Sequence, residues 1–306
     1  MRAVAFTEFG GPEVVTVRDL PTPTPAAGQV LVKVVASPVN PVDTAARAGY
    51  LGELLPAREV YVPGLEFSGV VTELGADADG FTLGQSVIGL LPWITDPVGS
   101  AAEYVVIAAD ALAPAPASVD PVAAATLPLN GITADLAVSA AQLAPGQRLL
   151  ITGAAGGVGG YAVQLAAAFG ARVIAVASAA DADLVRALGA SDVVDREHAD
   201  IESLRALGVD ALIDAAVRGP DLIAAARDDG RFVALLPPAA PESERGITVH
   251  TVQQSPNGPR LAELAGLVDA GTLTLRVADT LPLAEAAAAH ARLEKGGVRG
   301  RLVLLP

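Results

Sequence analysis

A glycine-rich junction near the middle of the chain constrains the fold more than any other segment. A short apolar stretch, Arg148–Thr152, predicts a buried strand, and the alanine- and leucine-rich stretch 159–169 predicts a helix after the glycines. A second strand over Arg172–Ala177 and a second helix over 181–188 follow directly. Because apolar strands that alternate with helices form parallel sheets covered on both faces, we expect an α/β fold with a doubly wound parallel sheet.

The junction itself has the spacing of a dinucleotide-binding turn. Gly156 would let the backbone approach a pyrophosphate, and Gly159 would let the helix pack closely against the sheet. Free N–H groups at the helix start, over Gly156, Gly157, Val158 and Gly159, would hold the phosphate charge with help from the helix dipole. Ala154 stands where such fingerprints usually have their first glycine, so the spacing survives with one substitution. A purely structural turn is the alternative.

The end of the second strand predicts which dinucleotide binds. An Asp or Glu there would bind the ribose 2′-hydroxyl of NAD and repel the 2′-phosphate of NADP, but this strand ends at Ser178 with no acid. We therefore expect NADP(H), with Ser178 and Arg196 at the 2′-phosphate and Arg186 as the second basic candidate. Asp181 and Asp183 follow closely and would repel a phosphate if they faced it, so NAD stays the alternative.

A later strand predicts a further contact with the ligand. The segments Ala211–Asp214 and 231–236 indicate two more strands with a helix between them. Ligands of doubly wound sheets bind at the carboxyl ends of the strands. We therefore expect the backbone of Leu235, Leu236 and Pro237 to meet the nicotinamide carboxamide.

Composition limits the classes of function that remain. The 306 residues are enough for two domains, and 52% hydrophobic with 18% charged residues indicates a packed globular protein. A net charge of −14 argues against nucleic acid as a partner, and no apolar run is long enough for a membrane span. The lack of cysteine removes disulfides, thiolate nucleophiles and cysteine-based zinc sites, and it is consistent with a cytoplasmic location.

Motifs along nearly the whole chain resemble one family. Outside the glycine-rich turn, the resembling segments are 1–4, 40–43, 63–69, 127–134 and 296–304. Together they are similar to the medium-chain dehydrogenase/reductase superfamily, in its zinc-independent, zeta-crystallin-like quinone oxidoreductase branch. The resemblance implies a mostly β GroES-like catalytic domain over 1–115, a Rossmann NADP-binding domain over 116–248 and a return to the catalytic domain over 249–306. It also implies a homodimer.

The resemblance bears on metal binding as well. Zinc-dependent relatives have a ligand cysteine where Asn40 stands and a ligand histidine where Leu65 stands. An amide and an aliphatic side chain are not zinc ligands, and Glu66 alone does not make a site. We therefore expect no metal.

The same resemblance points to catalytic residues. Asn40 resembles a family asparagine near the nicotinamide, although an Asx turn before Pro41 explains it equally well. Tyr50 resembles a tyrosine lining the catalytic cleft, whose phenol could donate a hydrogen bond or proton to a developing oxygen; a half-buried packing aromatic is the alternative. Thr133 resembles a threonine beside the nicotinamide, with a helix cap as its alternative. Asp43 is expected to orient the backbone.

The remaining features narrow the function. His198, His250 and His290 lack metal-ligand spacing; His290 is expected on a solvated helix face, and His250 is a possible substrate contact. Two loops, 51–61 and 92–99, are expected to shape the substrate pocket. No Ser-His-Asp arrangement supports a hydrolase.

The sequence thus predicts an NADPH-dependent, metal-free enzyme that passes hydride to a quinone or to the C=C bond of an α,β-unsaturated carbonyl. Its partner would be a small molecule. The alternatives are an NADPH-binding redox sensor without turnover and a carbonyl reductase.

Overall fold

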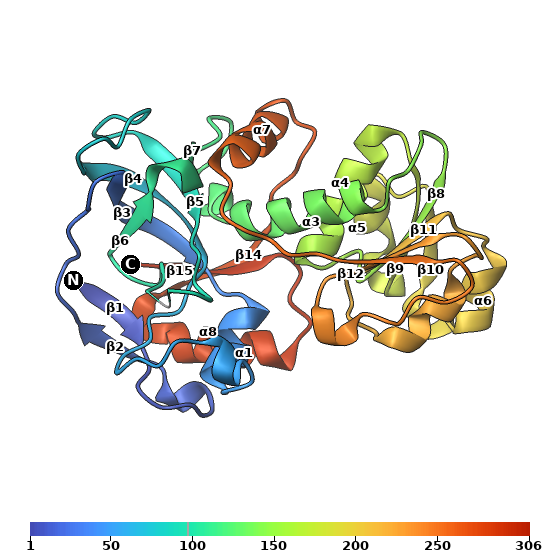
Figure 1. Ribbon diagram of the computed structural model, residues 1–306, viewed down its shortest axis with the longest axis horizontal. Coiled ribbons are helices and arrows are strands. Elements are labelled where there is room, and N and C mark those ends of the chain that lie inside the picture. Colours follow the sequence, from blue (N-terminus) through green and yellow to red (C-terminus); the bar gives the residue numbers. More distant parts are fainter. Residues whose placement is uncertain (97) are drawn as a thin grey trace. The chain divides into compact units, whose positions relative to one another are not determined.

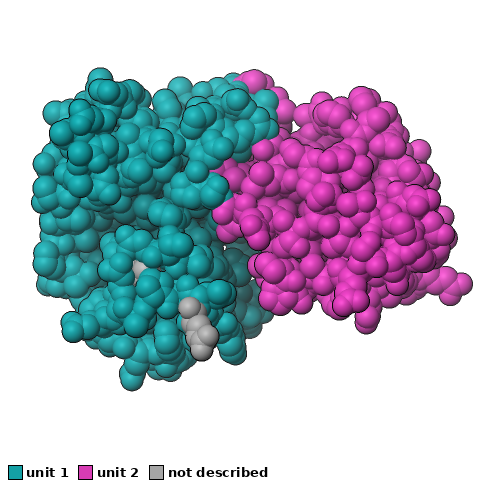
Figure 2. All heavy atoms as spheres, in the orientation of Figure 1, with its two compact units in different colours: residues 1–129, 255–269, 275–306 teal, residues 130–254, 270–274 magenta. Residues whose placement is uncertain are grey.

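The computed structural model describes residues 1–96 and 98–306, and the chain forms two compact units (Figure 2). Unit 1 comprises Met1–Leu129, Ser255–Asp269 and Leu275–Pro306, and unit 2 comprises Asn130–Gln254 and Ala270–Thr274. The chain enters and leaves unit 2 later than the expected boundaries at 115/116 and 248/249. The segment after residue 115 still packs on strands of unit 1, and a strand that ends at residue 251 still belongs to the sheet of unit 2.

Unit 2 is built on a parallel sheet with the strand order β10, β9, β8, β11, β12, β13 (Figure 1). Its strands are β8 Arg148–Thr152, β9 Arg172–Ala177, β10 Asp192–Asp195, β11 Ala211–Asp214, β12 Arg231–Ala234 and β13 Thr248–Thr251. In this order, which is that of doubly wound dinucleotide-binding folds, the winding reverses between β8 and β11. The predicted fold class is confirmed, and β8, β9 and β11 have the predicted bounds.

Helices and 3₁₀ turns connect these strands. They are α3 Pro128–Ala140, α4 Gly157–Phe169, α5 Ala182–Ala187, α6 Ile201–Ala206, η4 Ala179–Asp181, η5 Arg196–His198, η6 Pro220–Ala225 and η7 Pro237–Ala239. α4 begins at Gly157, two residues before its predicted start, and is followed by Gly170 with a left-handed φ of 93°. The helix expected between β11 and β12 is only the 3₁₀ turn η6, and β12 ends at Ala234, before the expected residue 236.

The core of unit 2 explains why the strands are apolar throughout. Leu150, Ile174, Leu212 and Phe232 come from four neighbouring strands, are almost completely buried and belong to one hydrophobic cluster. Because the sheet is covered by helices, neither face of a central strand reaches water. The polar residues of these strands are therefore placed at their ends.

Unit 1 is mostly antiparallel. Its main sheet runs β14, β15, β3, β4, β5, β7, with β6 paired to β3. The strands are β3 Gln29–Pro38, β4 Glu66–Leu74, β5 Ser86–Leu90, β6 Tyr104–Ala108, β7 Leu112–Pro114, β14 Val277–Pro282 and β15 Arg301–Leu305, and β1 Arg2–Ala5 pairs separately with β2 Thr16–Asp19. β3 pairs with β4, β6 and β15. The last strand of the chain thus adds to the sheet that the first segment of unit 1 forms.

The helices of unit 1 lie around this sheet. They are α1 Pro41–Arg47, α2 Pro121–Ala124, α7 Gly258–Asp269 and α8 Ala286–Lys295, with the 3₁₀ turns η1 Pro12–Val14, η2 Gly52–Leu54, η3 Ala109–Ala111 and η8 Leu283–Glu285. Within the ranges 1–96 and 98–306, the structure contains no helix whose length and hydropathy would suit a membrane crossing.

His290 corrects one expectation from the sequence. It lies on the buried side of α8 with only 1% of its surface exposed, so the expected solvated position is wrong. Small alanines let α8 pack against α1, so the His290 ring is buried between helices. The buried Arg47 of α1 lies near it, and its guanidinium pairs with Glu294. Burial, helped by the Arg47 charge, lowers the pKa of His290 to about 4, so the imidazole is neutral at pH 7.

Two glycine substitutions test the packing of unit 1. An added Cβ at Gly266, on the exposed side of α7, would contact nothing within 4 Å, so Gly266→Ala should stabilise the unit by about 0.5–1 kcal/mol. At Gly75, after β4, the Cβ would lie 1.9 Å from the Ala26 carbonyl oxygen, so Gly75→Ala should destabilise it by about 1–3 kcal/mol. Urea unfolding followed by fluorescence of Trp93, the chain's only tryptophan, measures both. Equal midpoints for the two variants would contradict this packing.

Candidate functional site

The predicted phosphate-binding turn lies at the carboxyl end of β8 in unit 2. Gly153 leaves the strand with a left-handed φ of 58°, and Gly156 N–H donates back to the Gly153 carbonyl at 2.9 Å. An added Cβ at Gly159 would lie 2.2 Å from that same carbonyl oxygen, so only glycine lets α4 start this close to the turn.

The start of α4 fits a dinucleotide phosphate. Gly157, Val158 and Gly159 form the first turn of the helix, and the N–H groups of a first turn have no partner within an α-helix. An added Cβ at Gly156 would meet only the Gly153 oxygen, at 3.1 Å, so the space beside Gly156 at the helix start is open. Backbone donors, a helix dipole and open space are what a pyrophosphate requires.

A pair of buried polar side chains, which the sequence analysis missed, holds the neighbouring loop. Thr152 Oγ1 donates to Asp214 Oδ1 at 2.6 Å and accepts from Ala216 N–H at 3.0 Å. Asp214 Oδ2 accepts from Gly219 N–H at 3.2 Å. Thr152 ends β8 and Asp214 ends β11, so the pair joins the two strand ends at which the winding reverses. In the sequence, the polar residue that ends each of these two apolar strands could have indicated the pair.

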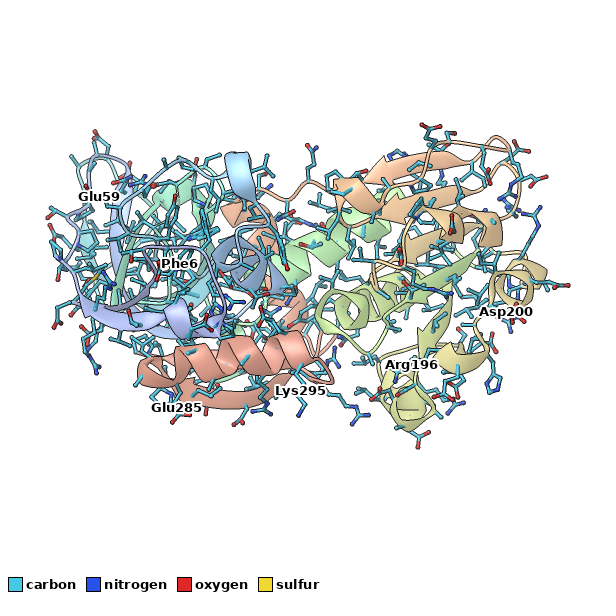
Figure 3. All side chains as sticks on the ribbon, turned by 90° about the horizontal axis from the view of Figure 1, so that it is seen from below. Phe6, Glu59, Arg196, Asp200, Glu285 and Lys295 are labelled. Carbon is cyan, nitrogen blue, oxygen red and sulfur yellow. The ribbon has the colours of Figure 1, made fainter. Side chains whose placement is uncertain are left out.

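The residues expected at the 2′-phosphate lie beside one another. β9 and β10 pair in parallel with Ala177 opposite Asp195, so Ser178 and Arg196 are the first residues beyond neighbouring strand ends. Arg196 is exposed at the start of η5, on the connection marked in Figure 3. Ser178 Oγ donates to the largely buried Asp181 at 2.5 Å.

The other charged side chains of this region are placed differently. Arg186, the second basic candidate, pairs with Asp183 at 3.2 Å on the exposed surface of α5. It is therefore already engaged, whereas no carboxylate in the described part of the chain pairs with Arg196.

The other expected residues of unit 2 lie at three further elements. Leu235, Leu236 and Pro237 follow the carboxyl end of β12, and Leu236 is 51% exposed. Thr133 is buried on α3. His250 is half-buried in β13, and its contact with substrate stays a prediction.

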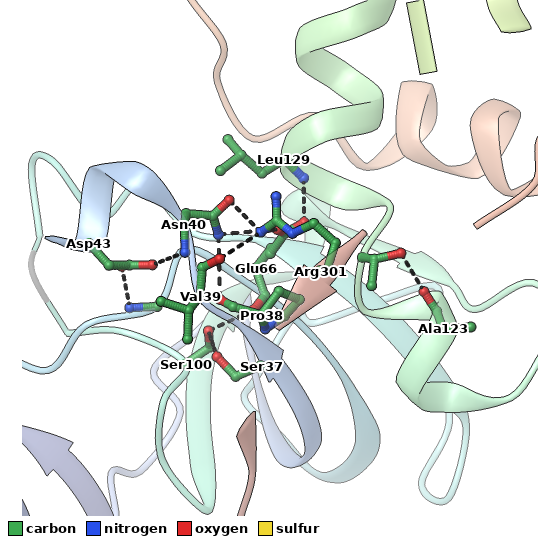
Figure 4. Close-up of polar contacts among 12 residues, drawn as sticks. Ser37, Pro38, Val39, Asn40, Asp43, Glu66, Ser100, Ala123, Leu129 and Arg301 are labelled. Carbon is green, nitrogen blue, oxygen red and sulfur yellow. Dashed lines mark hydrogen bonds and ion pairs between the residues drawn. The ribbon is translucent and has the colours of Figure 1, made fainter. Parts of the chain in front are cut away.

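Unit 1 contains a buried charge network around Glu66, shown in Figure 4. Arg301 Nη2 lies 2.8 Å from Glu66 Oε1 and 2.5 Å from Asn40 Oδ1. The Asn40 amide nitrogen donates to Glu66 Oε1 at 3.1 Å. Glu66 Oε2 accepts from Leu129 N–H, in the first turn of α3, at 2.8 Å. Burial raises the pKa of Glu66, while the Arg301 charge and these hydrogen bonds oppose that rise.

The Asn40 side chain belongs to this network, and its expected place near the nicotinamide stays a prediction. This side chain is 1% exposed, and both ends of the amide are engaged by Glu66 and Arg301. The start of α1 is instead capped by Asp43, whose Oδ2 accepts from Asn40 N–H at 2.7 Å and whose Oδ1 accepts from Gly64 N–H at 2.8 Å. Asp43 orients the backbone, as expected. The sequence analysis missed Arg301, although a charged residue opening an apolar strand was a usable signal.

The donor set at this position does not suit zinc. Asn40 and the buried aliphatic Leu65 are not ligands, and the Glu66 carboxylate is neutralised by Arg301. In the described ranges, no cluster of three or more acidic or histidine side chains could hold a metal ion.

Tyr50 lies outside this network. It follows α1, and its side chain is 84% exposed, so it is not a half-buried packing aromatic. Trp93 is fully buried, and its Nε1 donates to the Val62 carbonyl at 2.6 Å, so it stabilises its loop from inside. Pro97, in the loop 92–99, lies outside the described residues.

Two family models match the chain. The alcohol dehydrogenase GroES-like domain matches residues 26–117, and the model described as zinc-binding dehydrogenase matches residues 188–304. The first match falls in unit 1, and the second covers the later part of unit 2 and the end of unit 1.

Relatives and solved structures agree with these matches. Quinone oxidoreductase of Sus scrofa is 38% identical over 181 residues, or 58% of this chain and 53% of the relative; that of Homo sapiens is 37% identical over the same length. The match thus spans about half the length of these curated relatives. The quinone oxidoreductase structure from Coxiella burnetii has a TM-score of 0.92 and 32% identity over 100% of this chain and 99% of its own. An NAD-dependent alcohol dehydrogenase structure has a TM-score of 0.88 and 32% identity over both whole chains.

The Glu66–Arg301 pair should be strongly coupled to stability. Arg301→Met leaves the Glu66 carboxylate buried without its cation and should cost about 3–5 kcal/mol, whereas adding Glu66→Gln should restore most of the loss. The exposed Arg2–Glu103 pair gives the control, and Arg2→Met should change stability by less than about 1 kcal/mol. Trp93 fluorescence in urea measures all three. An Arg301→Met midpoint equal to that of the control would rule out a buried ion pair.

Asp43 should make unit 1 less stable as pH rises. Burial raises the pKa of Asp43 from 3.8 to about 6, so between these values the folded state binds more proton than the unfolded state. The unfolding free energy should therefore fall by about 2 kcal/mol from pH 4 to pH 6 through this group. Asp43→Asn does not titrate, so wild type should lose stability relative to the variant across that window. Parallel pH profiles of urea stability would contradict the raised pKa.

Proposed function

We propose that this chain, which belongs to the medium-chain dehydrogenase/reductase family as a zinc-independent quinone oxidoreductase type, uses NADPH to reduce a quinone or the C=C bond of an α,β-unsaturated carbonyl. The observation that carries the proposal is the glycine turn and open helix start at the point where the winding of the unit 2 sheet reverses. The bound nicotinamide supplies the hydride; the protein contributes binding, orientation and hydrogen bonds.

Residues of unit 2 would hold the dinucleotide. The N–H groups of Gly157, Val158 and Gly159 would bind the pyrophosphate, with Gly156 leaving room for it. Ser178 and Arg196 would meet the 2′-phosphate, since they lie beyond paired strand ends and the exposed Arg196 pairs with no carboxylate among the described residues. The backbone of Leu235, Leu236 and Pro237, together with Thr133, would contact the nicotinamide end.

Residues of unit 1 would act on the acceptor. The exposed Tyr50 hydroxyl is the proposed donor of a hydrogen bond or proton to the oxygen that gains negative charge. Asn40 would act by supporting the wall of the site, because its amide is held by Glu66 and Arg301. The same network supports chemistry without a metal, since the Arg301 guanidinium neutralises Glu66, the carboxylate beside the two positions that have lost their zinc ligands. A small organic substrate and a homodimer complete the proposal.

Turnover with purified protein tests this function. NADPH absorbance should fall when quinones or enones are added, the rate should persist in EDTA, and Arg196→Gln should weaken NADPH binding by about tenfold or more. Tyr50→Phe should lower the rate constant more than it changes NADPH binding. NADPH binding without oxidation by any acceptor would contradict an enzyme and favour the redox sensor; oxidation only by simple aldehydes would favour a carbonyl reductase.

A further inference from the structure

The contact between Ser178 and Asp181 affects how a dinucleotide can be recognised. Ser178 Oγ donates to Asp181 Oδ2 at 2.5 Å, and Asp181 N–H donates to the Ser178 carbonyl at 2.9 Å. Asp181 ends η4 with 9% of its surface exposed, so its carboxylate is largely shielded from bulk water. A hydroxyl has a single proton, and here that proton is directed to the carboxylate.

This arrangement favours a hydroxyl over a phosphate next to Ser178. While Asp181 takes the proton, the lone pairs of Ser178 Oγ remain for other neighbours, so a ribose 2′-hydroxyl can donate to them. A 2′-phosphate dianion has only acceptor oxygens and cannot accept from Ser178 unless the bond to Asp181 breaks. The carboxylate charge also repels the phosphate at short range, where little water screens it.

Arg196 acts in the opposite direction. It lies beside Ser178 because β9 and β10 end in register, it is exposed, and within the described residues it forms no ion pair. Its guanidinium would attract a 2′-phosphate and has nothing to gain from a 2′-hydroxyl. The Asp181 carboxylate and the Arg196 guanidinium would therefore act on a 2′-phosphate with opposite charges.

We propose that Asp181 is a specificity-determining residue that acts through Ser178 and limits the preference for NADPH set by Arg196, so that NADH also binds. This inference rests on the proposed function, since it needs the dinucleotide to bind at this edge. The wild-type protein then accepts both cofactors with a modest preference for NADPH, and removal of the Asp181 charge makes it selective.

Calorimetric titration of NADPH, NADH, 2′,5′-ADP and 5′-AMP tests the proposal without any turnover. Asp181→Asn keeps the side-chain shape and should tighten NADPH and 2′,5′-ADP by about three- to tenfold, while NADH and 5′-AMP change by less than about twofold. Glu202→Gln is the control: it removes the same charge from an exposed position on α6 of the same unit and should leave all four affinities unchanged.

A second variant separates action through Ser178 from a general charge effect. Ser178→Ala should weaken NADH several-fold, because the acceptor for the 2′-hydroxyl is lost, and should reduce the gain from Asp181→Asn in the double variant. Ligand-free melting temperatures confirm that each variant folds.

The outcomes separate the two proposals. Equal tightening of NADPH and NADH by Asp181→Asn, or none for the 2′-phosphate ligands while Arg196→Gln still weakens them, would overturn the role of Asp181 and leave the proposed function intact. Failure of every dinucleotide to bind wild type would overturn the proposed function itself.

Discussion

The arrangement of unit 1 depends on one buried ion pair between residues 235 positions apart in the chain. Arg301, which opens the last strand, and Glu66, which opens β4, neutralise each other where neither reaches water. The same carboxylate binds the Asn40 amide and the first turn of α3. A single buried charge would be unstable there, so the pair and its hydrogen-bond partners specify one arrangement of these segments.

Unit 2 places its chemistry by a different rule. Its central strands are apolar from end to end, so polar side chains gather where the strands stop. Thr152 and Asp214 are used to join two loops, whereas Arg196 remains exposed. Ser178 follows the end of β9, and its hydroxyl donates a hydrogen bond to the largely buried Asp181.

The sequence was informative wherever a local pattern had one physical outcome. Continuous apolar runs bounded by polar residues predicted β8, β9 and β11 to the residue, because burial on both faces tolerates no polar position. The close approach of α4 to its turn followed from glycine alone, since a Cβ at Gly159 would lie 2.2 Å from the Gly153 oxygen. Domain boundaries were less predictable, because they depend on which sheet a connecting segment packs against.

Taken alone, the order of its residues determined that this chain has an α/β unit with a glycine-rich turn between a strand and a helix, and that Asn40 and Leu65 stand where zinc-dependent relatives have ligands. Only the tertiary structure decided which polar groups face each other: that Arg301 neutralises Glu66, that the Asn40 amide is held between them, and that His290 is buried and neutral. The physical reason is that backbone conformation follows from neighbours in sequence, whereas the partner and the solvation of a charge follow from segments that meet only when the chain is folded.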